Sequence, residues 1–218
     1  RFFIQIITAL FLIKLSPLEI DTNILALNLL LKILLIFSIV AIINFVNFMD
    51  GIDGLVAGSM IVYLIIFSII FSPALIPLVG SLAAFLIYNW SPAKIFMGDV
   101  GSTFLGAIYI GYVFESNDLA IAIAKLLLLT PILSDCISCI IRRLMLGHNI
   151  FKAHKLHLYQ RLNQAGWKHS KVTIIYSSSF LILSLAYIFL GLPALIFLSI
   201  FIIIIGYYLD KNFAVGIY

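Results

Sequence analysis

The stretch "LLLKILLIFSIVAIINFVNFMDGIDG", residues 29–54, joins a long apolar run to a polar end. Lys32 is the only charged residue between positions 24 and 46, and a run of this length predicts a membrane-spanning helix. The run ends in Asn47, Asp50 and Asp53, with glycines directly after both aspartates. The stretch therefore predicts a helix in lipid that carries a polar cluster at one end.

The composition of the whole chain supports a membrane protein. Of its 218 residues, 64% are hydrophobic and 10% are charged, whereas soluble domains have about 25% charged residues. Uninterrupted runs of Ile, Leu and Phe favour helices over the alternating pattern of a barrel. We expect an all-α, polytopic transmembrane bundle in a single domain, residues 1–218, with about eight spans. The expected spans are 2–15, 24–46, 55–72, 74–90, 103–115, 119–141, 172–190 and 194–209, with Pro17, Pro73, Pro92 and Pro193 at or near the breaks.

The basic residues predict the orientation of these spans. Eight spans place on one side the two termini and the loops 47–54, 91–102 and 142–171. Ten of the thirteen Lys and Arg residues fall on this side: Arg1, Lys94, Arg142, Arg143, Lys152, Lys155, Arg161, Lys168, Lys171 and Lys211. The positive-inside rule makes this side cytoplasmic.

The first cytoplasmic polar cluster is the segment 47–54. Asn47, Asp50 and Asp53 are spaced three apart, so on a continuing helix they would share one face. Gly51 and Gly54 lack side chains and would let a bulky anion or a backbone segment approach closely. The same residues also suit an ordinary helix end, with Asp and Gly as turn formers.

The second cluster is "SPAKIFMGDVGSTFLG", residues 91–106. Asp99 lies between two glycines, just before an apolar span. A simple helix N-cap is one interpretation of this aspartate. The other is a phosphate or metal site at a helix start, with Lys94 close enough to contact phosphate.

The third cluster is the segment 141–171, which contains all four histidines. His154 and His157 lie one helical turn apart and could ligate zinc, although no His-Glu-x-x-His pattern is present. Seven basic residues surround them, including Arg142 and Arg143. These basic neighbours better fit binding of a nucleotide diphosphate by imidazole, Lys and Arg. The alternative is a basic loop that lies against anionic lipid headgroups.

Two features lie inside the predicted span 119–141. Asp135 is a functional candidate because intramembrane carboxylates are costly, and an ion pair with Arg142, two helical turns further on, is the structural alternative. Cys136 and Cys139 form a Cys-x-x-Cys pattern, which is often a metal or redox signal. They are the only two cysteines, so a four-thiolate site within the chain is impossible, and we interpret them as packing residues.

The three clusters together predict phosphoryl transfer. Carboxylates without thiolates select hard cations such as Mg²⁺, which bridges to substrate phosphates. A basic loop beside them would hold a polyanionic substrate, and positioning with charge neutralisation would do most of the catalysis.

The motifs "NFMDGIDGL" and "FMGDVGSTFLG", followed by the histidine-rich loop, resemble the polyprenyl-phosphate N-acetylhexosamine-1-phosphate transferases. The resemblance implies transfer of a sugar 1-phosphate from a UDP-N-acetylhexosamine to undecaprenyl phosphate, with release of UMP and with Mg²⁺ or Mn²⁺ as cofactor. It implies a bacterial inner-membrane enzyme with a cytoplasmic site, no nucleic-acid partner, and a homodimer as a candidate assembly.

The resemblance also assigns residue roles. It implies that Asp99 and Asp50 bind the metal and that Asp53 joins them as a catalytic residue. It implies that the substrates are bound by Asn47, Lys94, Arg142, Arg143, His154 and His157.

The chain departs from the family pattern in two places. Family members carry an Asp-Asp motif on an earlier loop, and this sequence has no Asp-Asp pair. The resemblance therefore predicts a fragment that begins just after that motif, inactive as given. In "AHKLHLYQRL", His157 keeps the first histidine of a pattern in which Tyr159 and Gln160 replace two others. This version is similar to O-antigen initiators thought to use N-acetylfucosamine or N-acetylquinovosamine, which makes N-acetylglucosamine less favoured.

Other classes of protein account less well for the sequence. A cation-coupled transporter would place its carboxylates near the bilayer midplane, whereas these lie at the ends of the predicted spans. An intramembrane aspartyl protease needs Gly-x-Gly-Asp, and here Phe96 occupies the first glycine position. The peptidoglycan enzyme, phospho-N-acetylmuramoyl-pentapeptide transferase, carries a run of histidines that this loop lacks.

Overall fold

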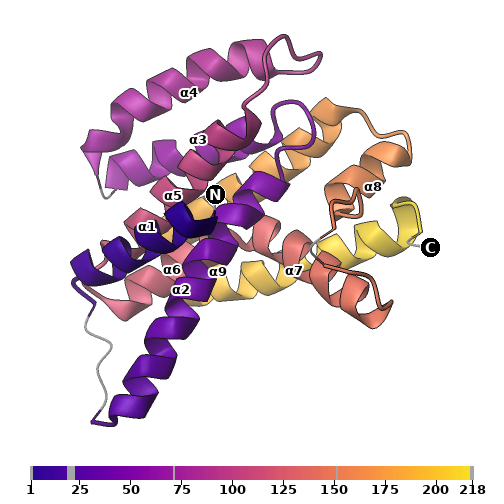
Figure 1. The fold of residues 1–218 in the computed structure, drawn as a ribbon. Helices are drawn as coiled ribbons and strands as arrows, with labels where there is room; N and C mark the ends of the chain where they lie inside the picture. The colour runs from indigo at the N-terminus through magenta and orange to yellow at the C-terminus, as the bar shows by residue number, and fades with distance from the viewer. Residues whose placement is uncertain (1, 19–22, 71, 151, 217–218) are drawn as a thin grey trace.

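A computed structural model describes residues 2–18, 23–70, 72–150 and 152–216, so the expected position of Arg1 lies outside the described residues. Within these ranges every regular element is a helix, which confirms the all-α prediction (Figure 1). The elements are α1 (Phe2–Leu15), α2 (Leu25–Phe48), α3 (Leu55–Ile70), the 3₁₀ turn η1 (Pro73–Leu75), α4 (Ile76–Asn89), α5 (Gly98–Phe114), α6 (Leu119–Leu128), α7 (Thr130–Met145), α8 (Leu158–Gln164) and α9 (His169–Phe213).

The expected count of about eight spans is not confirmed. Among the described residues, two helices are long and apolar enough to cross a membrane, α2 and α9, and a third span exists if the bent pair α6–α7 counts as one. The other apolar helices are shorter; α3, for example, has 16 residues, or about 24 Å at 1.5 Å per residue, against a hydrocarbon core of about 30 Å. The predicted segments therefore coincide with helices, but most are too short to count as separate spans.

The predicted span 119–141 is divided into two helices, because the chain bends by 72° between α6 and α7. Pro131 lies in the first turn of α7. A proline lacks the N–H that would bond to the preceding turn, and its ring crowds that turn, so a helix ends or bends there. The sequence predicted breaks at other prolines but not at Pro131.

The predicted break near Pro193 is present inside α9. Gly191 has φ +76° and ψ −168°, a non-helical conformation that favours glycine, and it separates two helical stretches. The long helix therefore changes direction two residues before the proline, as the sequence predicted for the boundary between 172–190 and 194–209.

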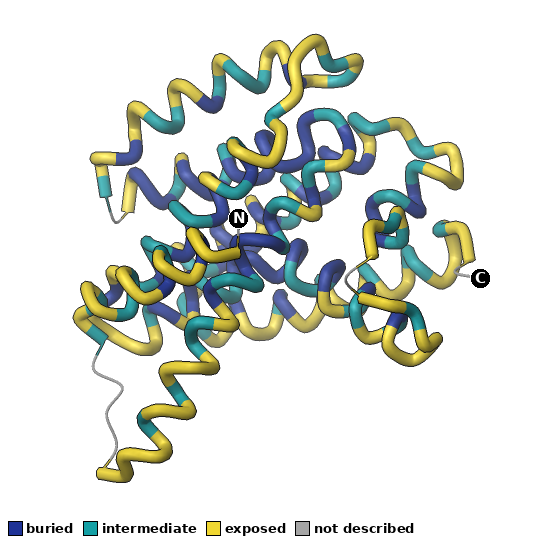
Figure 2. The backbone as a smooth tube through the Cα atoms, viewed as in Figure 1, coloured by how far each residue is buried: buried dark blue, intermediate teal, exposed yellow. Residues whose placement is uncertain are grey.

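The helices pack in pairs that are distant in sequence. α3 lies against α9, and α2 lies against α5. The buried apolar side chains of these pairs form one core, which includes Ile43, Met60, Tyr109 and Phe180. The first half of α2 projects beyond this core with Leu25, Leu29, Leu34 and Phe37 exposed (Figure 2). Exposed Leu and Phe side chains around a helix suit contact with lipid.

Four elements converge near the polar motifs. α2 ends at Phe48, α5 begins at Gly98, α8 is a short helix, and α9 begins at His169. These helix ends and the loops next to them carry the residues of all three polar clusters.

Candidate functional site

The segment 49–54 is a compact turn and does not continue α2. The backbone N–H groups of Met49 and Asp50 donate to the carbonyls of Val46 and Asn47, both at 3.2 Å, and close the helix end. Gly54 has φ +74°, in the left-handed region. The expected single helical face of Asn47, Asp50 and Asp53 is therefore not formed, and the two aspartates meet different partners.

Asp50 faces the start of α5. Its burial and the nearby negative charge of Asp99 raise the pKa of Asp50 from 3.8 to about 7, while a hydrogen bond from the Gly98 backbone opposes this shift. Asp99 lies exposed in the first turn of α5. The structure thus brings the first two clusters together as a pair of interacting carboxylates.

Asn47 connects the end of α2 to the same turn of α5. The Ser102 hydroxyl lies 2.7 Å from Oδ1 of Asn47 and 3.0 Å from the Gly98 carbonyl, so the two acceptors share one proton. Ser102 is completely buried. The sequence predicted no role for Ser102, whereas its hydroxyl fixes the end of α2 relative to the start of α5.

Asp53 bridges the loop before α5 to the start of α9. Its Oδ2 accepts from the backbone N–H of Ala93 at 3.2 Å and lies 3.1 Å from Nδ1 of His169. That nitrogen also lies 3.3 Å from the backbone N of Asp53. The first contact needs a proton on Nδ1 and the second needs a lone pair there, so only one of the two can be a hydrogen bond at a time. Asp53 is a junction between segments, and its direct part in catalysis stays a prediction.

Asn89 has a connecting role that sequence analysis missed. Its side chain is buried, with Oδ1 accepting from the Gly54 backbone at 3.1 Å and Nδ2 donating to the Ile95 carbonyl at 2.8 Å. The signal was an amide at the end of an otherwise apolar span. The loop between α4 and α5, which contains Ile95, also carries Lys94. The side chain of Lys94 is exposed, and its contact with phosphate stays a prediction.

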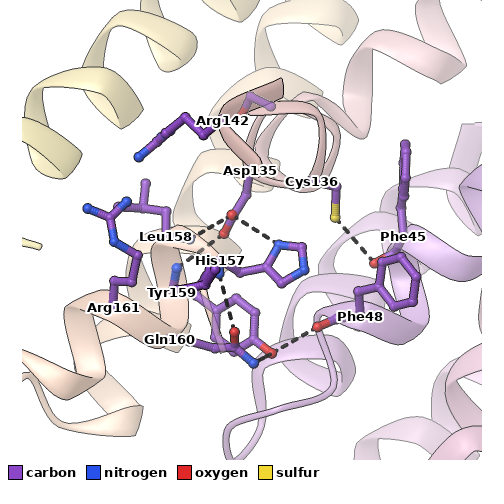
Figure 3. Close-up of polar contacts among 12 residues, drawn as sticks. Phe45, Phe48, Asp135, Cys136, Arg142, His157, Leu158, Tyr159, Gln160 and Arg161 are labelled. Carbon is purple, nitrogen blue, oxygen red and sulfur yellow. Dashed lines mark hydrogen bonds and ion pairs between the residues drawn. The ribbon is translucent and has the colours of Figure 1, made fainter. Parts of the chain in front are cut away.

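The histidine loop is held by Asp135, as Figure 3 shows. The carboxylate accepts from the backbone N–H groups of Leu158 and Tyr159 at 2.7 and 3.1 Å, and from the Tyr176 hydroxyl at 2.6 Å. Asp135 therefore fixes the first turn of α8 on α7. The alternative ion pair with Arg142 is replaced, since the guanidinium of Arg142 pairs with Asp210.

Tyr159 docks this loop on the first cluster. Its hydroxyl donates to the Phe48 carbonyl at 2.8 Å and accepts from Nε2 of Gln160 at 3.0 Å. A Cβ built on Gly51 would lie 2.1 Å from the Tyr159 hydroxyl oxygen. The space beside Gly51, which we expected to receive a bulky anion or a backbone segment, is therefore filled by the phenol of Tyr159.

The two candidate histidines of the loop stack on each other, with ring centroids 5.1 Å apart. Burial, followed by the positive charges of His157 and Arg143, lowers the pKa of His154 to about 4. Burial also lowers the pKa of His157, but the Asp135 carboxylate together with Cys136 and Cys139 outweighs it and leaves that pKa well above its ordinary value. The distance from Nδ1 of His157 to Oδ1 of Asp135 is 3.4 Å, which suits charge attraction, but the two atoms are not aligned as a hydrogen bond. His157 is 3% exposed, so its contact with a substrate stays a prediction.

The paired arginines have partners within the chain. The guanidinium of Arg143, which is buried, donates to the carbonyls of Asn149, Ile150 and Lys152 and shapes the loop. Asp210, near the end of α9, pairs with both Arg142 and Arg161. Substrate binding by Arg142 and Arg143 stays a prediction, and the geometry shows a structural use for each.

Comparison with known proteins gives the family. The model of glycosyl transferase family 4 matches residues 1–117. The chain belongs to this family. The matched residues include Asn47, Asp50, Asp53, Lys94 and Asp99, whereas the histidine loop follows the matched segment. The resemblance seen in the sequence is thereby confirmed.

Three relatives illustrate what this family 4 chain is similar to. It is 38% identical over 109 residues to a phospho-N-acetylmuramoyl-pentapeptide transferase of Carboxydothermus hydrogenoformans, covering 50% of the chain and 33% of the relative. It is 37% identical over 132 residues to a probable undecaprenyl-phosphate N-acetylglucosaminyl 1-phosphate transferase of Bacillus subtilis, covering 58% and 36%. It is 30% identical over 122 residues to a decaprenyl-phosphate N-acetylglucosaminephosphotransferase of Mycobacterium leprae, covering 48% and 31%. The match spans about a third of the length of each relative.

The acidic pair of the family 4 chain suits a hard divalent cation. Two carboxylates close enough to raise the pKa of Asp50 repel each other when both are ionised. A cation between them would remove this repulsion, and Mg²⁺ commonly uses one or two protein carboxylates together with waters and substrate phosphates. Asp50 and Asp99 therefore fit the metal expected from the sequence.

Proposed function

We propose that this chain is part of a transferase that moves an N-acetylhexosamine 1-phosphate from a UDP-sugar to undecaprenyl phosphate. In this reaction an oxygen of undecaprenyl phosphate attacks the phosphorus next to the sugar and forms a new P–O bond. The bond from that phosphorus to the bridging oxygen of the diphosphate breaks, and UMP leaves with the electron pair. The products are a lipid-linked sugar pyrophosphate and UMP.

The observation that carries this proposal is the Asp50–Asp99 pair at the junction of α2 and α5. Asp50 and Asp99 would hold Mg²⁺, which supplies charge neutralisation for the diphosphate and the leaving UMP. The chain itself contributes position. Ser102 and Asn47 fix the two helix ends relative to each other, and Asp53 keeps the loop that carries Lys94 beside them. Exposed Lys94 is then available for a phosphate oxygen.

The bilayer supplies the second substrate. We propose that the enzyme lies in a bacterial inner membrane, with its site at the cytoplasmic surface. The exposed apolar side chains of the first half of α2 support membrane contact, and the basic residues of the segment 141–171 support the orientation. A lipid phosphate would reach the acidic pair from the membrane side and the UDP-sugar from water.

The sugar is proposed as an N-acetylhexosamine, as in the printed names of the N-acetylglucosamine phosphotransferase relatives. Relatives named as phospho-N-acetylmuramoyl-pentapeptide transferases make UDP-N-acetylmuramoyl-pentapeptide the second candidate donor. Tyr159 and Gln160, which pack over Gly51, stand where many family members have histidines and favour the 6-deoxy sugars.

An exchange assay tests both the reaction and the sugar. Membranes that contain the full-length protein are incubated with radiolabelled UMP, undecaprenyl phosphate, Mg²⁺ and one UDP-sugar at a time. The panel holds the UDP forms of N-acetylglucosamine, N-acetylfucosamine, N-acetylquinovosamine and N-acetylmuramoyl-pentapeptide. Label should enter one UDP-sugar only when lipid phosphate is present. Absence of exchange with every donor would overturn the proposed reaction.

The Asp99→Asn variant tests the metal assignment within the same assay. Loss of one carboxylate should lower the exchange rate by at least about 100-fold, the scale expected when a preorganised charge is removed from a transition state. Asp118→Asn is the matched control, because Asp118 is an exposed N-cap of α6 that accepts from Ala120 and Ile121. Asn also caps helices, so this variant should keep its activity. Equal rates for Asp99→Asn and the wild-type protein would exclude Asp99 from the metal site.

A further inference from the structure

A second cluster of ligating side chains lies between α7 and the loop before α8. One ligand atom from each of Cys139, His154 and His157 lies within 4.8 Å of the other two. Among the described residues, these three form a group of His, Cys, Asp or Glu side chains whose ligand atoms are close enough to hold one metal ion. It is separate from the acidic pair, since it shares no residue with Asp50 or Asp99.

The surroundings of this cluster favour a bound ion over a solvated surface. Cys139 and His157 are 2% and 3% exposed, and His154 is half-buried. Nδ1 of His157 is fully buried and faces the Asp135 carboxylate, which leaves Nε2 of this ring as the nitrogen for an ion. Half-buried His154 leaves one side of the cluster open to solvent, which gives an ion a way in.

The chemistry of the three side chains selects the ion. One thiolate and two imidazoles suit Zn²⁺, whereas carboxylates and water suit Mg²⁺. Three protein ligands leave the fourth tetrahedral position for water or another ligand. Cys139 would lose its thiol proton to solvent when the ion binds, and both imidazoles would bind as neutral rings.

Asp135 supplies the support that such sites commonly have. A histidine that binds a metal through one nitrogen usually donates its other N–H to a carboxylate, and Nδ1 of His157 lies 3.4 Å from Oδ1 of Asp135. Two backbone N–H groups and the Tyr176 hydroxyl also donate to this carboxylate, which favours its ionised form. A divalent ion, one thiolate and one carboxylate sum to zero charge, which lowers the cost of burying them.

One contact would change on binding. The backbone N–H of Leu156 donates to Nδ1 of His154 at 3.3 Å. Binding at Nδ1 would use the same lone pair, and binding at the other nitrogen would place a proton on Nδ1. Either way this long hydrogen bond is replaced by a metal–ligand bond, which is much stronger.

We propose that Cys139, His154 and His157 form a binding site for one zinc-type divalent cation, distinct from the Mg²⁺ expected at Asp50 and Asp99. The site ties α7 to the segment that leads into α8. It thereby fixes the histidine loop, whether or not the transfer reaction is the one proposed above.

Metal binding to the purified full-length protein tests this proposal without an activity assay. The protein in detergent is stripped with a chelator and titrated with Zn²⁺ against a chromophoric competitor, in an excess of Mg²⁺. About one Zn²⁺ per chain should bind. Co²⁺ in place of Zn²⁺ should give a thiolate-to-cobalt charge-transfer band. Failure of Zn²⁺ to bind, or its displacement by Mg²⁺, would overturn the site.

Matched variants identify the ligands. Cys139→Ser should remove the cobalt band and lower zinc affinity by more than the roughly 10- to 100-fold that loss of a ligand's hydrogen-bond partner costs. Cys136→Ser is the control, because this equally buried cysteine packs its Sγ 3.7 Å from the Phe45 carbonyl. His154→Ala should likewise lose affinity, and His148→Ala in the same loop should keep it. Identical behaviour of the two cysteine variants would contradict the assignment.

X-ray absorption of the zinc-loaded wild-type protein makes the result independent of variant folding. The spectrum should require one sulfur and two imidazole nitrogens in the coordination shell. A shell of oxygen and nitrogen alone would refute the proposal.

Discussion

Asp135 and Asp50 are two partly or fully buried carboxylates with opposite surroundings. Asp135 receives two backbone N–H groups and a tyrosine hydroxyl. Asp50 receives the Gly98 backbone N–H but also faces the charge of Asp99. A carboxylate with several donors stabilises its surroundings, whereas a carboxylate next to another stores repulsion that a cation can relieve. The comparison separates a residue that builds the fold from a pair suited to a ligand.

Replacement of Asp135 should give the largest loss of stability. Asp135→Ala leaves three buried donors without their acceptor, so the free energy of unfolding should fall by about 3–5 kcal/mol. Chemical unfolding of the protein in detergent micelles measures this. Asp118→Ala, which removes an exposed helix cap, should cost only about 1 kcal/mol. A loss for Asp135→Ala no greater than for Asp118→Ala would remove the distinction drawn between the two carboxylates.

Disruption of the contact between Gly51 and Tyr159, which joins the segment 49–54 to the histidine loop, should cause an intermediate loss of stability. Gly51→Ala places a Cβ 2.1 Å from the Tyr159 hydroxyl oxygen, so the phenol must move and give up its bond to the Phe48 carbonyl. Overpacking of this kind costs about 1–3 kcal/mol.

A double-mutant cycle tests this clash. Tyr159→Phe removes the oxygen, so Gly51→Ala should cost less in that background than in the wild type. Unfolding free energies of the four proteins give the coupling. Strict additivity would mean that Tyr159 does not fill the space beside Gly51.

The pH dependence of stability should come from Asp50. Its pKa of about 7 lies above the unfolded-state value near 3.8, so the folded chain holds a proton that the unfolded chain releases. With metals chelated, stability should therefore fall as the pH rises through the window between these two values, and Mg²⁺ should oppose the fall at the upper end.

Thermal unfolding across this pH range measures the effect, and Asp50→Asn is the control. The variant has no titrating group at this position, so its stability curve should be flatter. A curve for Asp50→Asn identical to that of the wild type would assign the pH dependence to another group.

The sequence predicted the helices well because apolar runs and prolines mark them. All eight predicted segments begin or end within four residues of an observed helix end, and the break near Pro193 is present at Gly191. The count of about eight spans is not confirmed, since an apolar helix such as α3 stops at 16 residues. The bend at Pro131 was missed because the apolar pattern continues across it.

The sequence predicted the main residues of the site but not the hydrogen bonds that connect them. The grouping of Asp50 with Asp99 followed from the motifs, and the structure places them close enough to interact. Asn89 and Ser102 were not assigned roles, because a buried hydrogen bond between distant segments leaves no periodic pattern in a sequence. Asp135 was recognised as unusual for its apolar setting, but its partners lie 23 to 41 residues away, and no local pattern names them.

Asp210 bears on the order in which the molecule can assemble. It pairs with Arg142 and Arg161, and the carbonyl of Val215 accepts from Nε of Arg161 at 2.6 Å. Arg161 of the histidine loop is therefore held by residues that are synthesised about fifty positions later in the chain. During synthesis the contacts of this loop with Asp135 and with the Phe48 carbonyl can form first, and the ion pairs to Asp210 are added only when the last turns of α9 have been made.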